Sequence, residues 1–186
     1  MNDGPLYTLV IATLNAGLAG YPEFGSVAVK QAYQPRTVGA PSGASLLLSS
    51  SNAKRYGYLR RANIWVPPNP PALGYMERTE AQMWIQTFQC NAQVMAPPQP
   101  DTVQDFTSGD LAAAASWILQ GDDGRAALLA GGVFIDRVTD IRNPFFKNEQ
   151  GQFQQSPSFD FTLSYEEVKT YRANILTSAI FRILGV

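Results

Sequence analysis

The stretch from Ile141 to Tyr165, IRNPFFKNEQGQFQQSPSFDFTLSY, determines the fold more than any other part of the chain. A turn-forming Asn-Pro pair, a polar loop and a strictly alternating segment follow one another in it. The apolar residues of that segment share one face: Phe159, Phe161, Leu163 and Tyr165. The polar residues share the other: Asp160, Thr162, Ser164 and Glu166. This period predicts a half-buried antiparallel strand with one core face and one face toward water or a partner.

The residues before this strand predict a projecting hairpin suited to docking rather than to catalysis. Lys147 to Gln155 is expected to form its polar tip, with the apex at Gln150-Gly151. We assign to an oligomer or docking interface Asn143, Phe145, Phe146, Lys147, Asn148, Glu149, Gln152 and Phe153.

Alternation predicts further strands along the chain. They are expected over Val27 to Tyr33, Leu46 to Leu48, Ala62 to Val66, Trp84 to Val94, and from Val133 onward. In the strand that begins at Trp84, the predicted core face carries Phe88, Cys90 and Ala92, whereas Gln89, Asn91 and Gln93 face outward. Such amides can donate and accept hydrogen bonds across a subunit boundary, although a solvated face explains them equally simply.

Helix signals occur in three places. Gly4-Pro5 predicts a helix start, with an end near Gly17 or Gly20. Ser108 is the predicted N-cap of an Ala-rich helix over Leu111 to Leu119. Asp122-Asp123 begin a second short helix that Gly131-Gly132 end. The final segment, Ile175 to Val186, fits a helix or a short closing strand.

These patterns predict one α+β domain over residues 1–186. An antiparallel or mixed β-sheet is expected, covered by two or three short helices, with extended loops and a projecting β-hairpin. Proline-rich stretches at Pro67 to Pro71 and Pro97 to Pro100 are expected to be stiff connections that cannot join a sheet ladder.

Composition narrows the function. The net charge is −1 and only 16% of residues are charged, which argues against a basic nucleic-acid footprint and against disorder. Histidine is absent, so Ser-His and Cys-His chemistry cannot occur within the chain. Cys90 is the single cysteine, which excludes an intramolecular disulfide and a Cys-rich zinc site and fits folding in the cytoplasm. Leu6 to Leu18 is too short for a membrane span, and Asp3 argues against a signal peptide.

Candidate chemistries based on carboxylates are weak. Asp160 and Glu166 share a strand face but lie roughly 20 Å apart along an extended chain, too far for paired acid–base work. A metal site could be sought at Asp122 and Asp123 or in the region Asn143 to Glu149, but the acidic residues there do not have the spacing of a calcium loop. Capping of the following helix explains the aspartate pair. We therefore expect no enzyme, no catalytic or metal site and no cofactor.

The most basic patch of the sequence is the strongest competing site. Lys54, Arg55, Arg60 and Arg61 are interleaved with Tyr56 and Tyr58, which could stack on bases. Arginine and tyrosine are also enriched at protein interfaces. A lumen-facing site near passing DNA and an ordinary subunit interface or solvated strand edge both remain open for this patch.

The chain resembles the tail terminator or neck terminator proteins of tailed bacteriophages from about Leu6 to its C-terminus. The resemblance is carried by the strand around Trp84 to Val94, the helices from Leu111 to Ala130, and IRNPFFKNE followed by PSFDFTLSY. It implies a virion structural protein, assembled in the host cytoplasm, that forms a homohexameric ring at the head-proximal end of the tail. The implied partners are further copies, the tail tube protein, a neck or connector protein, and genomic DNA passing without sequence specificity.

Two other functions stay open at this point. A head-side neck connector or adaptor would share the ring but bind the portal side. A sequence-independent nucleic-acid-binding module belongs to a different class, and a histidine-free hydrolase is a weaker third possibility.

Overall fold

The computed structural model describes residues 3–32, 43–51, 53–67, 74–94, 106–147 and 153–173. The chain divides into two compact units: the first contains residues 1–55 and 84–165, and the second contains residues 56–83 and 166–186. The elements run in this order: α1 (Asp3–Leu18), the 3-10 turn η1 (Pro22–Phe24), β1 (Ala28–Gln31), β2 (Ser45–Ser50), β3 (Lys54–Val66), β4 (Tyr75–Gln93), α2 (Ser108–Gln120), α3 (Asp122–Ala130), β5 (Val133–Val138), β6 (Phe145–Lys147), β7 (Phe153–Gln155) and β8 (Ser158–Ala173).

The main sheet is mixed, with strand order β1-β2-β4-β8-β5, and β3 also pairs with β4. β1 and β2 are parallel, whereas β2 pairs with β4 and β5 pairs with β8 in antiparallel fashion. The register of β5 shifts between Ile135 and Arg137, where an irregularity returns Val138 to the core side opposite Phe161. The predicted α+β fold, with a mixed sheet and short helices, is therefore confirmed.

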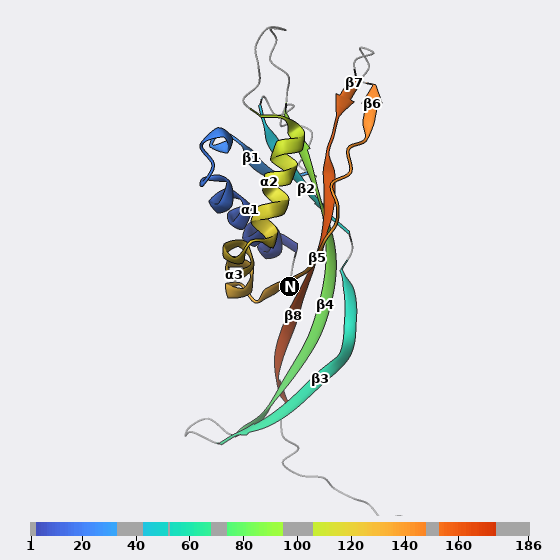
Figure 1. Ribbon diagram of the computed structural model, residues 1–186. Helices are drawn as coiled ribbons and strands as arrows, with labels where there is room; N and C mark the ends of the chain where they lie inside the picture. Colours follow the sequence, from blue (N-terminus) through green and yellow to red (C-terminus); the bar gives the residue numbers. More distant parts are fainter. Residues whose placement is uncertain are drawn as a thin grey trace, which may run out of the picture. The chain divides into compact units, whose positions relative to one another are not determined.

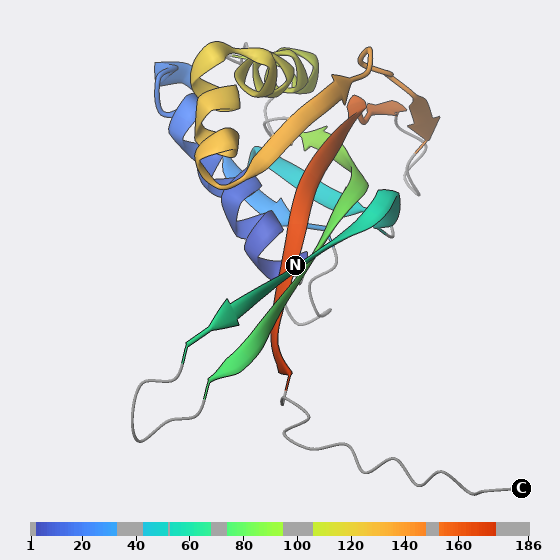
Figure 2. The same cartoon turned by 90° about the horizontal axis from the view of Figure 1, so that it is seen from below.

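In the first unit, α1, α2 and α3 lie on the same face of the sheet (Figures 1 and 2). The alternation of β8 decides which face that is, because Phe159, Phe161 and Leu163 are fully buried. Phe161 stacks on Phe88 of β4 with ring centroids 5.3 Å apart. Phe88 in turn meets Tyr7 of α1 edge-on at 5.1 Å. The predicted core faces of β4 and β8 are thus both confirmed, and aromatic rings connect them to the helical layer.

The N-cap of helix α2 lies one residue earlier in the sequence than predicted. Its N-cap is Thr107, not Ser108, because Thr107 and Asp110 form a reciprocal capping box. Thr107 Oγ1 accepts a hydrogen bond from the Asp110 N–H at 3.2 Å, and the Thr107 N–H donates to Asp110 Oδ2 at 2.9 Å. The Thr107 hydroxyl also donates to Asp110 Oδ2, at 2.7 Å. The hydrogen bonds from the Thr107 N–H and hydroxyl stabilise the charged carboxylate and lower the pKa of Asp110. Their contribution to stability is present above the ordinary aspartate pKa and is lost as pH falls through the lowered value.

The second unit contains a three-stranded ribbon, which we define as Tyr56–Val66 of β3, Tyr75–Met83 of β4 and Glu166–Ala173 of β8. Within it β4 has hydrogen-bonded neighbours in both β3 and β8. The described ribbon residues are exposed or partly exposed, so neither face of the ribbon forms a buried core among the described residues.

Several strands extend beyond the sequence prediction. β4 begins at Tyr75 rather than near Trp84, and β8 continues to Ala173 rather than ending near Glu166. Four predictions fall on residues that the structure does not describe: the loop over Thr37 to Gly43, apart from Gly43 itself, the connection at Pro97 to Pro100, the hairpin apex at Gln150-Gly151, and the helix or strand over Ile175 to Val186.

Candidate assembly surfaces

The predicted hairpin is present as a two-stranded sheet of its own. β6 and β7 pair antiparallel, with Phe145 opposite Gln155, Phe146 opposite Gln154 and Lys147 opposite Phe153. Figure 1 shows β6 and β7 at one end of the first unit, away from the three helices. Of the residues assigned to docking, Asn143 is exposed before β6, while Asn148, Glu149 and Gln152 lie outside the described residues.

The base of the hairpin is held firmly to the sheet. Arg142 and Ser158 exchange two backbone hydrogen bonds of 2.8 Å. Arg142 also forms an ion pair with Asp160, with 2.6 Å between Nη2 and Oδ2. On the other strand, Ser156 Oγ donates to Asn91 Oδ1 at 2.9 Å. These contacts therefore fix where β6 and β7 leave the main sheet.

The basic patch predicted on β3 does not form one cationic surface. Arg60 and Arg61 are consecutive strand residues, so they project from opposite faces. Arg60 forms an ion pair with Glu166, and Arg61 Nε lies 3.1 Å from Glu80 Oε1. Lys54 and Arg55 belong to the first unit, where the Arg55 guanidinium lies 5.5 Å from the centroid of the Trp84 ring. Three of the four cations thus already have partners within the chain.

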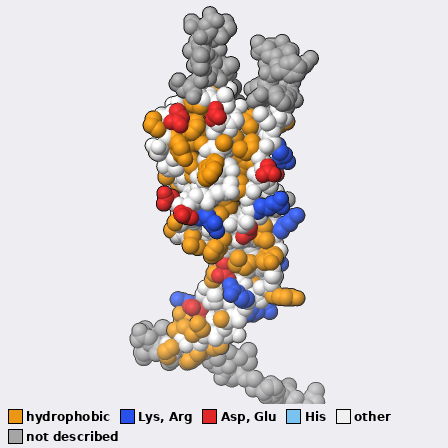
Figure 3. All heavy atoms as spheres, viewed as in Figure 1, with side chains coloured by type: hydrophobic (Ala, Val, Ile, Leu, Met, Phe, Trp, Pro, Cys, Tyr) orange, Lys and Arg blue, Asp and Glu red, His pale blue; other side chains and the backbone are white. Residues whose placement is uncertain are grey.

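The ribbon exposes large apolar side chains, of which the sequence analysis selected only Tyr56 and Tyr58, as part of the basic patch. Tyr58 is 96% exposed, and the other exposed large apolar residues of the ribbon are Tyr56, Leu59, Ile64, Trp65, Val168 and Tyr171. Figure 3 shows hydrophobic side chains at the surface of the ribbon, with basic and acidic side chains among them. The adjacent pair Ile64-Trp65 was the available signal, because consecutive apolar residues in a strand place apolar surface on both faces.

The face of the first-unit sheet opposite the helices is mainly polar. Gln89 is exposed, Thr87 Oγ1 and Thr162 Oγ1 lie 3.3 Å apart, and Ser164 Oγ donates to Asp136 Oδ1 at 3.1 Å. Phe134 is an apolar exception on this face, opposite Ser164 and 52% exposed. The predicted polar second faces of β4 and β8 are therefore confirmed, and many of their groups are hydrogen-bonded within the sheet.

Groups that could carry chemistry are sparse in the described part of the chain. Burial raises the pKa of the Cys90 thiol to about 12, so its reactive thiolate form is suppressed near neutral pH. No cluster of three or more cysteine, aspartate or glutamate residues with metal-binding geometry occurs among the described residues. Asp122 and Asp123 lie in the first turn of α3, where carboxylates are favoured by the helix dipole. The predicted capping by this pair is wrong, because the N-cap is Gly121 and no side-chain cap hydrogen bond forms. None of the helices described is both long and apolar enough to cross a membrane.

Comparison with known proteins gives one family. The family model described as E217 gateway protein gp29 matches residues 5–175, which include nearly all of α1 and all of β8. No curated protein matches the chain.

Proposed function

The chain belongs to the E217 gateway protein gp29 family, and from this premise we propose that it forms a closed ring of identical subunits at the head-proximal end of a phage tail. Membership makes the chain a structural component of the bacteriophage virion, at the junction of head and tail. The finer proposal is that the ring ends growth of the tail tube and joins the tail to the neck. This proposal corresponds to the tail terminator resemblance.

The observation that carries self-assembly is the ribbon. A strand layer gains stability by burying an apolar face against another layer, and exposed contiguous apolar surface marks interaction sites. The ribbon carries Tyr58, Ile64 and Trp65 in the open, with Ile64 and Trp65 on opposite faces, and has no buried core among its described residues. A neighbouring copy that covers either face would supply a missing layer. We propose that the covering surface is not the ribbon itself, so that the contact is heterologous and closes into a ring when its rotation closes.

Six copies are proposed from the resemblance to tail terminators. Such a ring would present one side to the last tube ring and a different side to the neck, and a tube subunit could not add to the second side. The hairpin β6–β7 suits one of these contacts, because it is anchored at its base by Arg142 and Ser158 and leaves the sheet at one end.

Within this proposal, genomic DNA passes through the ring without sequence-specific contacts. The pairing of Arg60 and Arg61 with Glu166 and Glu80 supports weak, non-specific contact, because paired guanidinium groups offer less net charge to phosphates. We also propose that the chain acts by assembly rather than catalysis, needs no cofactor, and assembles in the host cytoplasm.

The direct test is the mass of the native assembly. We expect native mass spectrometry of the purified full chain to show a species of six times the 20.3 kDa subunit. Negative-stain images should show closed rings that cap the ends of added tail tubes. A strict monomer at every concentration would contradict the ring. Rings that ignore tubes but bind neck proteins would instead support the head-side connector.

Shortening the hairpin tests its role separately. Replacing residues 147–153 by Asn-Gly joins Phe146 to its cross-strand partner Gln154 through a two-residue turn of a type that hairpins favour. Rings should still form, because the anchoring contacts of Arg142 and Asp160 remain. The fraction of tubes capped should fall at least tenfold in negative-stain counts. Unchanged capping, with ring yield also unchanged, would remove the hairpin from the docking surface.

A further inference from the structure

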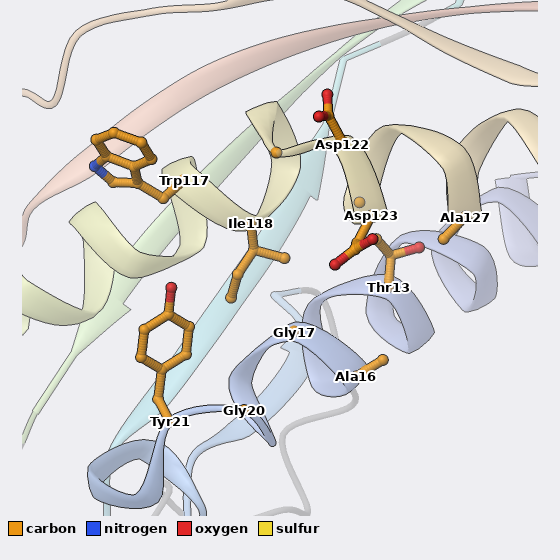
Figure 4. A pocket seen from close by; sticks show the side chains of 12 residues that line it. Thr13, Ala16, Gly17, Gly20, Tyr21, Trp117, Ile118, Asp122, Asp123 and Ala127 are labelled. Atoms are coloured by element: carbon orange, nitrogen blue, oxygen red, sulfur yellow. The ribbon is translucent and has the colours of Figure 1, made fainter.

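A hollow in the helical layer of the first unit is not explained by the fold. It has a volume of about 490 Å³ and lies between α1 and the junction of α2 with α3. Figure 4 shows Trp117, Ile118 and Tyr21 around it, with Gly17 and Gly20 on the α1 side. We define the groove by its lining residues Thr13, Gly17, Gly20, Trp117, Ile118 and Ala127, together with the acidic pair discussed next.

The groove is apolar inside and acidic at one side. Trp117 is 73% exposed although it is a large aromatic residue on a helix that packs in the core. Asp122 and Asp123 also line the groove, both are exposed, and neither takes part in the ion pairs found among the described residues. An occupant that matches this chemistry would combine aliphatic side chains with a positive charge.

One segment of the chain has that composition. Residues 174–186, NILTSAIFRILGV, lie outside the described residues and carry one basic residue, Arg182, and no acidic side chain. Their aliphatic residues recur at the spacing of one helical face: Ile175, Leu176, Ala179, Ile180, Ile183 and Leu184. Residues 176–186 also fall beyond the range that the family model matches.

We propose that residues 174–186 of one copy occupy the groove of the neighbouring copy, with Arg182 beside Asp122 and Asp123. A volume of about 490 Å³ is within the range of pockets of roughly 300–1,000 Å³ that enclose organic groups, so it can accept several aliphatic side chains. The segment spans about 45 Å when extended and about 20 Å as a helix. A segment and a groove are different surfaces, so every copy gives one contact and receives one.

This proposal rests on the proposed ring, and disulfide cross-linking in the full chain tests it. The test variant carries Ala127→Cys in the groove and Ile180→Cys in the segment. Mild oxidation should give a ladder of covalent oligomers, up to the ring, on a non-reducing denaturing gel. A faster-migrating monomer would mean that the segment binds its own groove and would overturn the proposal. Absence of any cross-link would overturn it too.

The matched control places the second cysteine on the same helix but outside the groove. Leu129 is 53% exposed on α3 and does not line the groove, so Leu129→Cys with Ile180→Cys should cross-link at least tenfold more slowly. The native chain, whose single Cys90 is buried, should give no ladder. Equal rates at the two positions would overturn the proposed site, because they would indicate random collision.

The charge contact is tested in the Ala127→Cys, Ile180→Cys variant. Asp123→Arg or Arg182→Asp alone should slow cross-linking roughly two- to fivefold, as expected for an exposed ion pair, and the two changes together should restore the rate. Additive slowing would exclude the assigned pairing. Native mass spectrometry of the same samples separates the two proposals: rings without cross-links overturn only the groove contact, whereas monomers overturn the ring and with it the groove contact.

Discussion

Replacing Phe161 with alanine is expected to lower the free energy of unfolding by about 3–5 kcal/mol, the range for a fully buried phenylalanine. The side chain is completely buried, stacks on Phe88 at 5.3 Å and lies 6.1 Å from Phe159. Truncation removes the transfer free energy of the ring and leaves a cavity that strands hydrogen-bonded on both sides of β8 cannot close. Urea unfolding followed by circular dichroism measures the change as a shift of the midpoint.

The control for Phe161 is Phe134 in the neighbouring strand β5. Phe134 lies on the opposite face of the same sheet and is 52% exposed, so Phe134→Ala should cost about 1 kcal/mol or less. Comparable losses for the two variants would contradict the assignment of the faces of β8 and β5. That result would mean that the polar face of the sheet is covered in solution by something absent from the single chain.

The alternation that made Phe161 predictable holds only where one strand face is buried. In β8, Phe159, Phe161, Leu163 and Tyr165 are all buried, as the alternation predicted. On the opposite face Asp160 and Thr162 are partly exposed, whereas Ser164 is only 8% exposed. The continuation of the same strand, from Glu166 to Ala173, belongs to the ribbon and has charged and apolar residues on both faces. Because neither ribbon face is buried, the strand does not need an apolar face, and its sequence lacks the alternation of apolar and polar residues that would reveal a strand.

The same reasoning accounts for the first half of β4. Residues 75–83, YMERTEAQM, mix charged and apolar side chains without a period of two, and the sequence prediction started the strand only near Trp84. From Phe88 to Ala92 alternate residues are buried and the pattern returns. Strand length was therefore underestimated wherever the strand enters the ribbon, although strand existence was predicted correctly.

The candidate surfaces were predictable in residue type but not in pairing. Arg60 and Arg61 were recognised as a basic pair, but their partners Glu166 and Glu80 lie 106 and 19 residues away and become neighbours only through strand pairing. The α2 N-cap was predicted one residue late for a related reason. Ser108 and Thr107 are both good caps, and only the geometry shows that Thr107 and Asp110 satisfy each other.

Replacing Gly124 with alanine is expected to lower the free energy of unfolding by about 2 kcal/mol, even though alanine ordinarily stabilises a helix relative to glycine by about 0.5–1 kcal/mol. A Cβ atom at this position would lie 1.9 Å from the backbone oxygen of Ile118 and 2.9 Å from its carbonyl carbon. Both atoms belong to the backbone of α2, so no side-chain rotation relieves the overlap, and α3 must move. Overpacking of this kind costs about 1–3 kcal/mol or more, which outweighs the gain in helix propensity.

Gly109 of α2 provides the opposite sign under the same substitution. A Cβ atom there would meet only Thr107 Oγ1, at an ordinary contact distance of 3.5 Å. Gly109→Ala should therefore raise the free energy of unfolding by up to about 1 kcal/mol, measured in the same urea titrations. A stabilising effect at both positions would mean that α2 and α3 do not approach each other as closely as Gly124 requires. The groove beside them, which Gly124 also lines, would then have a different width.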